Sequence, residues 1–139
     1  MELGLNGKGV IVTGGSRGIG FSTAEAFARE GANVSICARS EGPLETARKS
    51  LASHGGTVHA AACDVSDPAA LADYFAAAHQ ALGALHVLVN NPSGFGRTDD
   101  EDGWQVSIDV DLMAPVRGSW HAVPLIEAAG GGAIVHISS

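Results

Sequence analysis

The stretch GVIVTGGSRGIG, residues 9–20, decides the fold of this 139-residue chain. Its first five residues predict a short buried strand, and three glycines, Gly14, Gly18 and Gly20, follow directly before a helical pattern begins. Gly14 permits a tight turn off the strand, Gly18 lets backbone N–H groups approach a pyrophosphate, and Gly20 lets the helix pack close to the sheet. The order of strand, glycine turn and helix therefore predicts an anion-binding site at a helix N-terminus.

Outward from this stretch, short apolar runs alternate with helical stretches along the whole chain. The runs are continuously apolar, which is typical of parallel strands covered on both faces. The βαβαβαβαβ order predicts an α/β protein with a doubly wound parallel sheet, a Rossmann fold, with five strands in the order 3-2-1-4-5. The predicted strands cover residues 9–13, 33–38, 57–63, 85–89 and 133–137, and the predicted helices cover 18–30, 42–54, 68–82 and about 101–129.

Two helices carry further local signals. Ser66 or Asp67 is expected to cap the third helix, because a side-chain oxygen there can accept from the open N–H groups of the first turn. Pro115 and Gly118 fall inside the fourth helical stretch, where they predict a kink or break.

Length and composition limit the class of protein. The chain is long enough for one domain, and its net charge of −7 without a basic stripe argues against nucleic acid or an anionic membrane as a partner. Cys37 and Cys63 lack CxxC spacing and predict two buried, reduced thiols. No signal peptide and no apolar run of about 20 residues is evident, so we expect a cytoplasmic protein.

Several other chemistries lack their motifs. The six histidines show neither i,i+4 pairs nor HExxH spacing, so no metal site is predicted. The glycine turn lacks the GK[ST] of a nucleoside-triphosphate loop. These patterns leave dinucleotide binding as the favoured interpretation of the glycine turn.

The spacing TGxxxGxG over residues 13–20 resembles that of the short-chain dehydrogenase/reductase family, and the resemblance extends over essentially the whole chain. Four further segments carry it: CDV at 63–65, NN at 90–91, Trp104 followed by DVDL at 109–112, and IVHISS at 134–139.

This resemblance implies NAD(P) as the cofactor and assigns residues to it. Asp64 would accept from the adenine amino group, Val65 would pack on the ring, and Asn90 would line the adenosine side of the cleft and help to fix the fourth strand. The residues that would hold the pyrophosphate and neighbouring groups are Gly14, Ser16, Arg17, Gly18, Ile19 and Gly20.

The end of the second predicted strand indicates which dinucleotide is preferred. An acidic residue there would bind the ribose hydroxyls of NAD, but this position is Ala38, followed by Arg39. Arg17 points toward the same region in the family. Because guanidinium groups grip phosphate with a bidentate fork, Arg39 and Arg17 favour NADP over NAD.

The catalytic set that the resemblance implies is incomplete. The family uses Asn, Ser, Tyr and Lys; Ser139 matches the serine, and Asp111 stands where the family usually has Asn. The Tyr-xxx-Lys pair has no counterpart, since Tyr74 lies in the third predicted helix. Pro92 also replaces a residue of the family's Asn-Asn-Ala-Gly turn, which predicts a different loop path near the cofactor.

The sequence therefore predicts an oxidoreductase that transfers hydride between NADP(H) and a small carbonyl or alcohol substrate. A 3-oxoacyl thioester reductase, a ketosteroid reductase and a sugar dehydrogenase share this pattern up to Ser139. The alternative is a non-catalytic NAD(P)-binding module or pseudoenzyme.

We expect residues 1–139 to be one domain that is incomplete at its C-terminal end, because the last strand would end as a bare sheet edge. Because the Tyr-xxx-Lys pair is missing, we expect this part to be inactive alone. The complete enzyme would be a homodimer or homotetramer, since the resemblance places a subunit interface along the fourth helical stretch. Its apolar residues are Val106, Leu112, Val116, Trp120, Val123 and Ile126.

Overall fold

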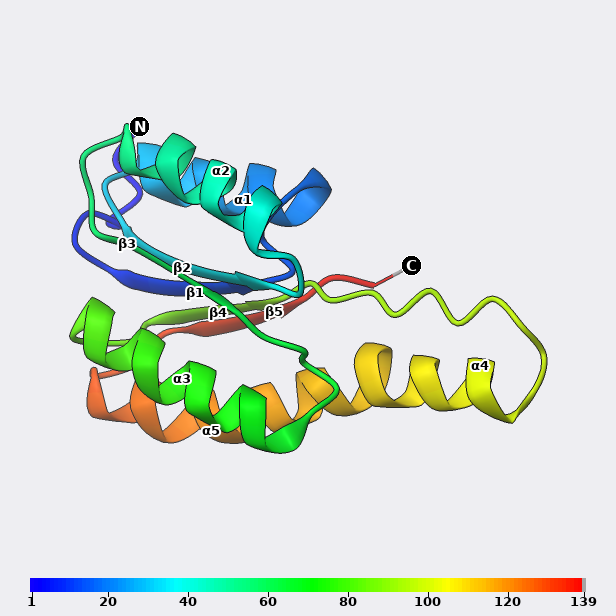
Figure 1. Ribbon diagram of the computed structural model, residues 1–139. Helices are drawn as coiled ribbons and strands as arrows, with labels where there is room; N and C mark the ends of the chain where they lie inside the picture. The colour runs from blue at the N-terminus through cyan, green and yellow to red at the C-terminus, as the bar shows by residue number, and fades with distance from the viewer. Residues whose placement is uncertain (139) are drawn as a thin grey trace.

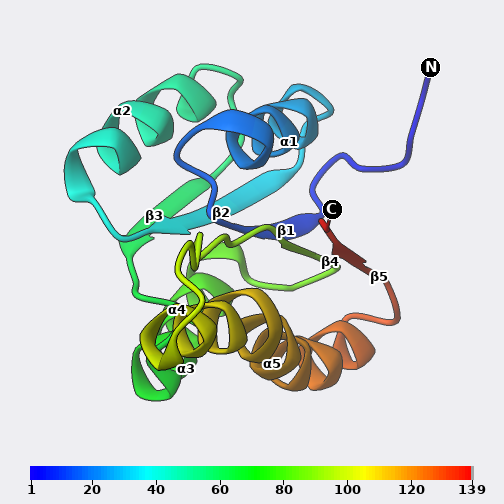
Figure 2. The ribbon, with the colours of Figure 1, turned by 90° about the vertical axis from the view of Figure 1, so that its right-hand side faces the viewer.

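Five parallel strands form one sheet in a computed structural model that describes residues 1–138. Their order is β3-β2-β1-β4-β5, which confirms the predicted Rossmann topology (Figure 2). The chain runs from β1 outward to β3, returns to β4 beside β1, and so leaves adjacent strand ends facing one crevice. The strands are β1 (Gly9–Thr13), β2 (Asn33–Ala38), β3 (Val58–Ala62), β4 (Val87–Asn90) and β5 (Ala133–His136).

Helices cover both faces of this sheet (Figure 1). On one face lie α1 (Gly18–Arg29) and α2 (Glu41–Ala52), and on the other lie α3 (Pro68–Leu82) and α5 (Ala114–Ala128). Every residue of β1 is buried, with Val10 and Val12 facing α1 and α2 while Ile11 belongs to the layer beneath α3. Two apolar layers therefore explain why the strands read as continuous apolar runs.

The predicted kink or break does not fall at Gly118, since α5 is continuous through it, and the fourth helical stretch changes directly before Pro115. α4 (Glu101–Val106) passes into the π-helical segment η1 (Ser107–Met113), and only then does α5 begin. Pro115 stands in the first turn of α5, directly after η1, where its missing N–H leaves the Asp111 carbonyl without an α-helical donor. Gly118 serves close packing instead, since an added Cβ would stand 3.0 Å from Asn90 Oδ1.

Strand boundaries differ from the prediction by one or two residues. Leu85 is fully buried but precedes β4, and Thr57 precedes β3. An apolar run marks burial, whereas a strand is defined by its hydrogen-bonded partners, so the two limits need not coincide. Within residues 1–138, none of the helices combines the length and apolar character that a membrane crossing demands.

Asp67, one of the two predicted caps, begins α3. Its Oδ1 accepts from the N–H groups of Ala69 and Ala70 at 3.0 and 3.3 Å. Asp67→Ala should lower the free energy of unfolding by about 1 kcal/mol, because both donors lose their acceptor. Asp73→Ala on the exposed face of the same helix is the matched control and should change it by less than about 0.5 kcal/mol. Equal effects of the two substitutions in urea denaturation would contradict the capping role.

Candidate functional site

The turn between β1 and α1 has no room for side chains. Gly14 has φ +64°, and a Cβ there would overlap the carbonyl oxygen of Asn91. A Cβ on Gly20 would overlap the carbonyl oxygen of Gly14. The first turn of α1 therefore lies directly against the end of β1, as the glycine spacing predicts.

Asn91 holds this turn against the end of β4. Its side-chain amide donates to the Gly14 carbonyl at 3.2 Å, and its backbone N–H donates to Thr13 Oγ1 at 3.1 Å. The Thr13 hydroxyl in turn donates to the Val89 carbonyl at 3.4 Å. Asn91 was missed as a site residue by the sequence reasoning, although the NN pair at 90–91 carried the signal. It fixes the position of the glycine turn at the centre of the sheet edge.

The N-terminus of α1 offers open backbone donors. The N-cap residue Arg17 makes no side-chain cap, as is also the case at α2, whereas α3 and α4 are capped by Asp67 and Asp100. Gly18 has φ +58° and open space where a Cβ would stand, and Ile19 is 65% exposed. Unpaired N–H groups at a helix N-terminus attract an anion. Because Gly18 has no side chain, an anion could approach the backbone of this turn.

The adenosine side of the predicted site lies at the ends of β2 and β3. The backbone N–H of Cys63 donates to the Ala38 carbonyl at 2.9 Å, which places Asp64 next to Arg39. Asp64 Oδ1 accepts from the Ser66 hydroxyl at 2.7 Å and from its N–H at 3.0 Å. These bonds, with a smaller contribution from the charge of Arg39, lower the pKa of the Asp64 carboxyl. A charged carboxylate and an exposed guanidinium therefore lie together at this corner.

The other predicted cofactor residues are divided between surface and interior. Arg17 and Arg39 are exposed, and in the described part of the chain neither takes part in an ion pair. Ser16 and Val65 are half-buried, and Val65 packs against the layer under α3. The two guanidinium groups are therefore free to bind an anion.

Asn90 is 2% exposed, and its side chain faces β5 rather than the crevice. Its Nδ2 lies 3.2 Å from His136 Nδ1, and its carbonyl accepts from the Ile137 N–H at 2.9 Å. This arrangement joins the carboxyl ends of β4 and β5. Any contact of Asn90 with a nucleotide would go through its backbone.

Asp111 lies in η1 and holds the loop that follows β4. Its Oδ1 accepts from the Gly94 N–H at 2.8 Å, and the carboxylate remains exposed. Pro115 has no N–H to donate to the Asp111 carbonyl, which an uninterrupted α-helix would require. The loop after Asn91 and the segment η1 are therefore joined at this residue, beyond the ends of the strands (Figure 1).

The remaining catalytic candidates lie elsewhere. Tyr74 is buried under the sheet, with its hydroxyl 2.6 Å from Ser35 Oγ. Ser139 lies outside the described residues. Among residues 1–138 no three His, Cys, Asp or Glu side chains gather as metal ligands would.

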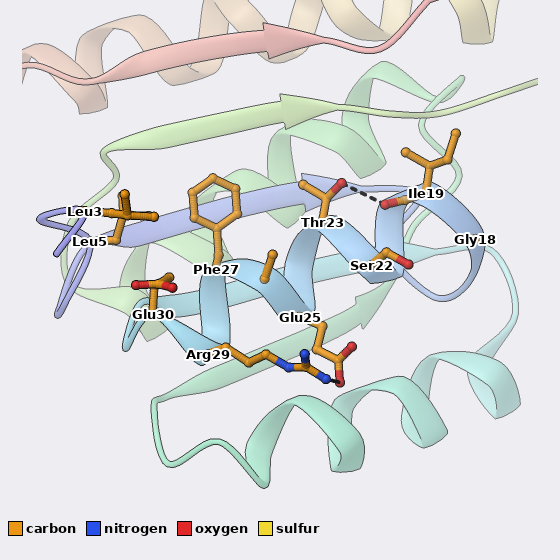
Figure 3. A pocket seen from close by; sticks show the side chains of 11 residues that line it. Leu3, Leu5, Gly18, Ile19, Ser22, Thr23, Glu25, Phe27, Arg29 and Glu30 are labelled. Carbon is orange, nitrogen blue, oxygen red and sulfur yellow. Dashed lines mark hydrogen bonds and ion pairs between the residues drawn. The ribbon is translucent and has the colours of Figure 1, made fainter. Parts of the chain in front are cut away.

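A groove runs along the flank of α1 (Figure 3). Leu3, Leu5 and Phe27 line one end, and Gly18 and Ile19 lie at the other. An ion pair between Arg29 and Glu25, 3.3 Å apart, lies on the helix between them. The groove therefore meets the predicted phosphate site only at the glycine turn.

Comparison with known proteins identifies the class that this fold and site define. The family model described as short chain dehydrogenase matches residues 8–139. A short chain dehydrogenase/reductase of Macrophomina phaseolina is 38% identical, with 97% of this chain and 82% of the relative covered. The chain belongs to the short-chain dehydrogenase family.

Two further relatives carry more specific names. The cyclohexanol dehydrogenase of an Acinetobacter species is 34% identical, covering 97% of this chain and 56% of the relative. The crystal structure of L-sorbose reductase from Gluconobacter frateurii, complexed with NADPH and L-sorbose, matches with TM-score 0.92 and 36% identity, covering 98% of this chain and 54% of that one. The chain thus spans about half the length of most of the relatives described here.

The bond between Asp111 and Gly94 should be visible in amide hydrogen exchange. Asp111→Ala should speed exchange of the Gly94 amide about fivefold, because a bond of about 1 kcal/mol is lost. Asp111→Asn keeps an acceptor oxygen and should exchange at close to the original rate. Asp109→Ala in the same segment is the control, since its carboxylate accepts from Gln105. Unchanged exchange in Asp111→Ala would show that the carboxylate does not hold the loop.

Proposed function

We propose that these residues form the dinucleotide-binding half of an NADP(H)-dependent oxidoreductase that acts on a small carbonyl or alcohol compound. The observation that carries the proposal is the uncapped N-terminus of α1, with open space at Gly18, set on the carboxyl end of the central strand. NADP(H), when bound, supplies or accepts the hydride. The protein's part in this half is to hold and orient the dinucleotide.

Different residues would bind different parts of the dinucleotide. The turn from Gly14 to Gly20, with Ser16 and Ile19, would hold the pyrophosphate on backbone N–H groups. Asp64 and Val65 would bind the adenine, and Asn90 would support the adenosine side through its backbone. The Ser66 hydrogen bonds that lower the pKa of Asp64 favour its ionised form, whose oxygens can accept from the adenine amino group.

The preference for NADP rests on charge. Arg39 follows Ala38 at the end of β2, where a carboxylate would repel a 2′-phosphate. Arg17 lies at the beginning of α1 and is exposed like Arg39. Two such guanidinium groups can bind the additional phosphate by charge-assisted hydrogen bonds. The NADPH complex of the sorbose reductase supports the same preference.

The catalytic part of the proposal involves Ser139 and Asp111. Ser139 would polarise the substrate oxygen, and Asp111 would position the loop at Gly94 beside the reacting end of the cofactor. The Tyr-xxx-Lys pair of the family does not occur in these 139 residues, so the proposal requires it from the complete gene product. The names of the relatives, which refer to cyclohexanol and L-sorbose, support a small alcohol or carbonyl as substrate. A 3-oxoacyl thioester belongs to the same chemical class.

The proposal also includes the assembly of the protein into an oligomer and its location in the cell. Trp104, Leu112, Trp120 and Val123 are 44–68% exposed on the outer side of α4, η1 and α5, which supports a second copy as partner in a homodimer or homotetramer. Ile126, expected on this surface, is instead 8% exposed in the core. The two unbridged thiols support a cytoplasmic location.

Replacing Arg39 tests the cofactor assignment. Arg39→Ala should weaken NADPH binding about tenfold or more and leave NADH binding unchanged, because only NADPH carries the 2′-phosphate. Arg48→Ala, an exposed arginine of α2 paired with Glu45, is the matched control. Fluorescence titration with both dinucleotides measures the affinities. Tighter binding of NADH than NADPH by the unaltered protein would reject the assignment.

Turnover by the complete gene product tests the activity. NADPH consumption should depend on an added carbonyl compound from a panel of ketones, keto-sugars and 3-oxoacyl thioesters. Dinucleotide binding without any turnover would favour the non-catalytic binding module instead.

A further inference from the structure

Two thiols lie side by side beneath the adenosine end of the candidate site, and the proposed function uses neither. Cys37 belongs to β2 and is fully buried, while Cys63 directly follows β3 and is 6% exposed. Cys37 pairs in register with Ala61, so Cys63, two residues further along, projects from the same face of the sheet. Both side chains lie in the apolar layer beneath α3.

The two thiols differ in reactivity. Hydrogen bonding from Cys37 lowers the pKa of the Cys63 thiol, and the same interaction, together with burial, raises the pKa of the Cys37 thiol. Because the thiolate is the reactive form, Cys63 is the better nucleophile. Cys63 also lies at the end of its strand with 6% of its surface exposed, whereas Cys37 is fully buried. Cys37 lies behind it and keeps its proton.

A line of hydrogen-bonding groups connects the thiols with the edge of the sheet. The Tyr74 hydroxyl lies beside Cys37 and 2.6 Å from Ser35 Oγ. Ser35 Oγ lies 2.8 Å from Nδ1 of His59, which is half-buried and stacks on the Tyr74 ring. Polar groups in a core need partners, and here they form a chain along which a proton can leave the interior.

We propose that Cys37 and Cys63 form a peroxide-oxidisable thiol pair. The Cys63 thiolate attacks one oxygen of hydrogen peroxide; the S–O bond forms, the O–O bond breaks, and the departing hydroxide takes up a proton to give water. The Cys37 sulfur then attacks the Cys63 sulfur; the S–S bond forms, the S–O bond breaks, and the departing hydroxide takes the Cys37 proton. Two thiols are oxidised to one disulfide, and one peroxide is reduced to two waters.

This oxidation acts on the nucleotide site through the backbone. Cys63 lies two residues beyond the register partner of Cys37 on a neighbouring parallel strand, so their Cα atoms stand roughly 8 Å apart, whereas a disulfide usually needs about 4.4–6.8 Å. The segment after β3 must therefore move toward β2, and Asp64 moves with it. On the other side, the Cys37 carbonyl accepts from the Gly15 N–H of the glycine turn at 3.1 Å. Forming the disulfide thus disturbs both the adenine corner and the turn, which lie at neighbouring strand ends (Figure 2).

Peptide mapping of the complete gene product tests the thiol pair. After treatment with hydrogen peroxide, digestion without reductant should yield a peptide in which Cys37 is linked to Cys63, and dithiothreitol should remove the link. In Cys37→Ser, Cys63 should stop at sulfenic acid, which dimedone traps. In Cys63→Ser, Cys37 should stay reduced under the same treatment. Absence of the linked peptide from the unaltered protein would overturn the proposal, whatever the variants do.

Titration with NADP⁺ tests the consequence, which rests on the proposed function. The oxidised protein should bind about tenfold more weakly than the reduced one, and dithiothreitol should restore the affinity. Peroxide should not change the affinity of the double variant Cys37→Ser, Cys63→Ser. If the protein with the disulfide formed bound NADP⁺ as tightly as the reduced protein, the proposed coupling between the thiol pair and the nucleotide site would be overturned. A reduced protein that binds no dinucleotide would count against the proposed function. The presence or absence of the linked peptide would still decide whether Cys37 and Cys63 form an oxidisable pair.

Discussion

The contact between the first turn of α1 and the end of β1 is the constraint on which the rest of the structure depends. Gly20 can approach the Gly14 carbonyl only because it carries no side chain, and Gly14 can likewise lie against the Asn91 carbonyl. This approach directs the open N–H groups of the helix toward the carboxyl ends of the strands. A phosphate group bound there would meet backbone rather than side chains. The parallel sheet supplies the geometry, since its chain reversal between β1 and β4 opens a crevice at that place.

Around this contact, each neighbouring strand contributes one element of the site. Asn91 directly follows β4 and bonds the glycine turn, and Arg39 directly follows β2 and lies beside the carboxylate of Asp64. η1 contributes Asp111, which holds the loop at Gly94. Because these residues come from separate segments, the sheet must form before the site exists. Core stability and binding are therefore coupled in this fold.

The sequence was sufficient for the parts of the structure that local patterns encode. Burial on both faces gives continuous apolar strands, and the spacing of Gly14, Gly18 and Gly20 follows from the turn geometry. It did not reveal the role of Asn91, because that role depends on β4 lying beside β1. The partner of Asp111 is set by the path of a loop 17 residues earlier in the chain. The π-helical segment changes only the hydrogen-bond pattern of the backbone, so the sequence marked a change near Pro115 but not the segment itself.

If the proposed function is right, a bound dinucleotide rests its pyrophosphate on the backbone at the beginning of α1. A crystal structure of the complete gene product grown with NADP⁺ tests this directly. We expect pyrophosphate oxygens within hydrogen-bond distance of N–H groups in the turn from Gly14 to Gly20, with the 2′-phosphate beside Arg39. A dinucleotide bound elsewhere, with the β1–α1 turn facing only solvent, would contradict it.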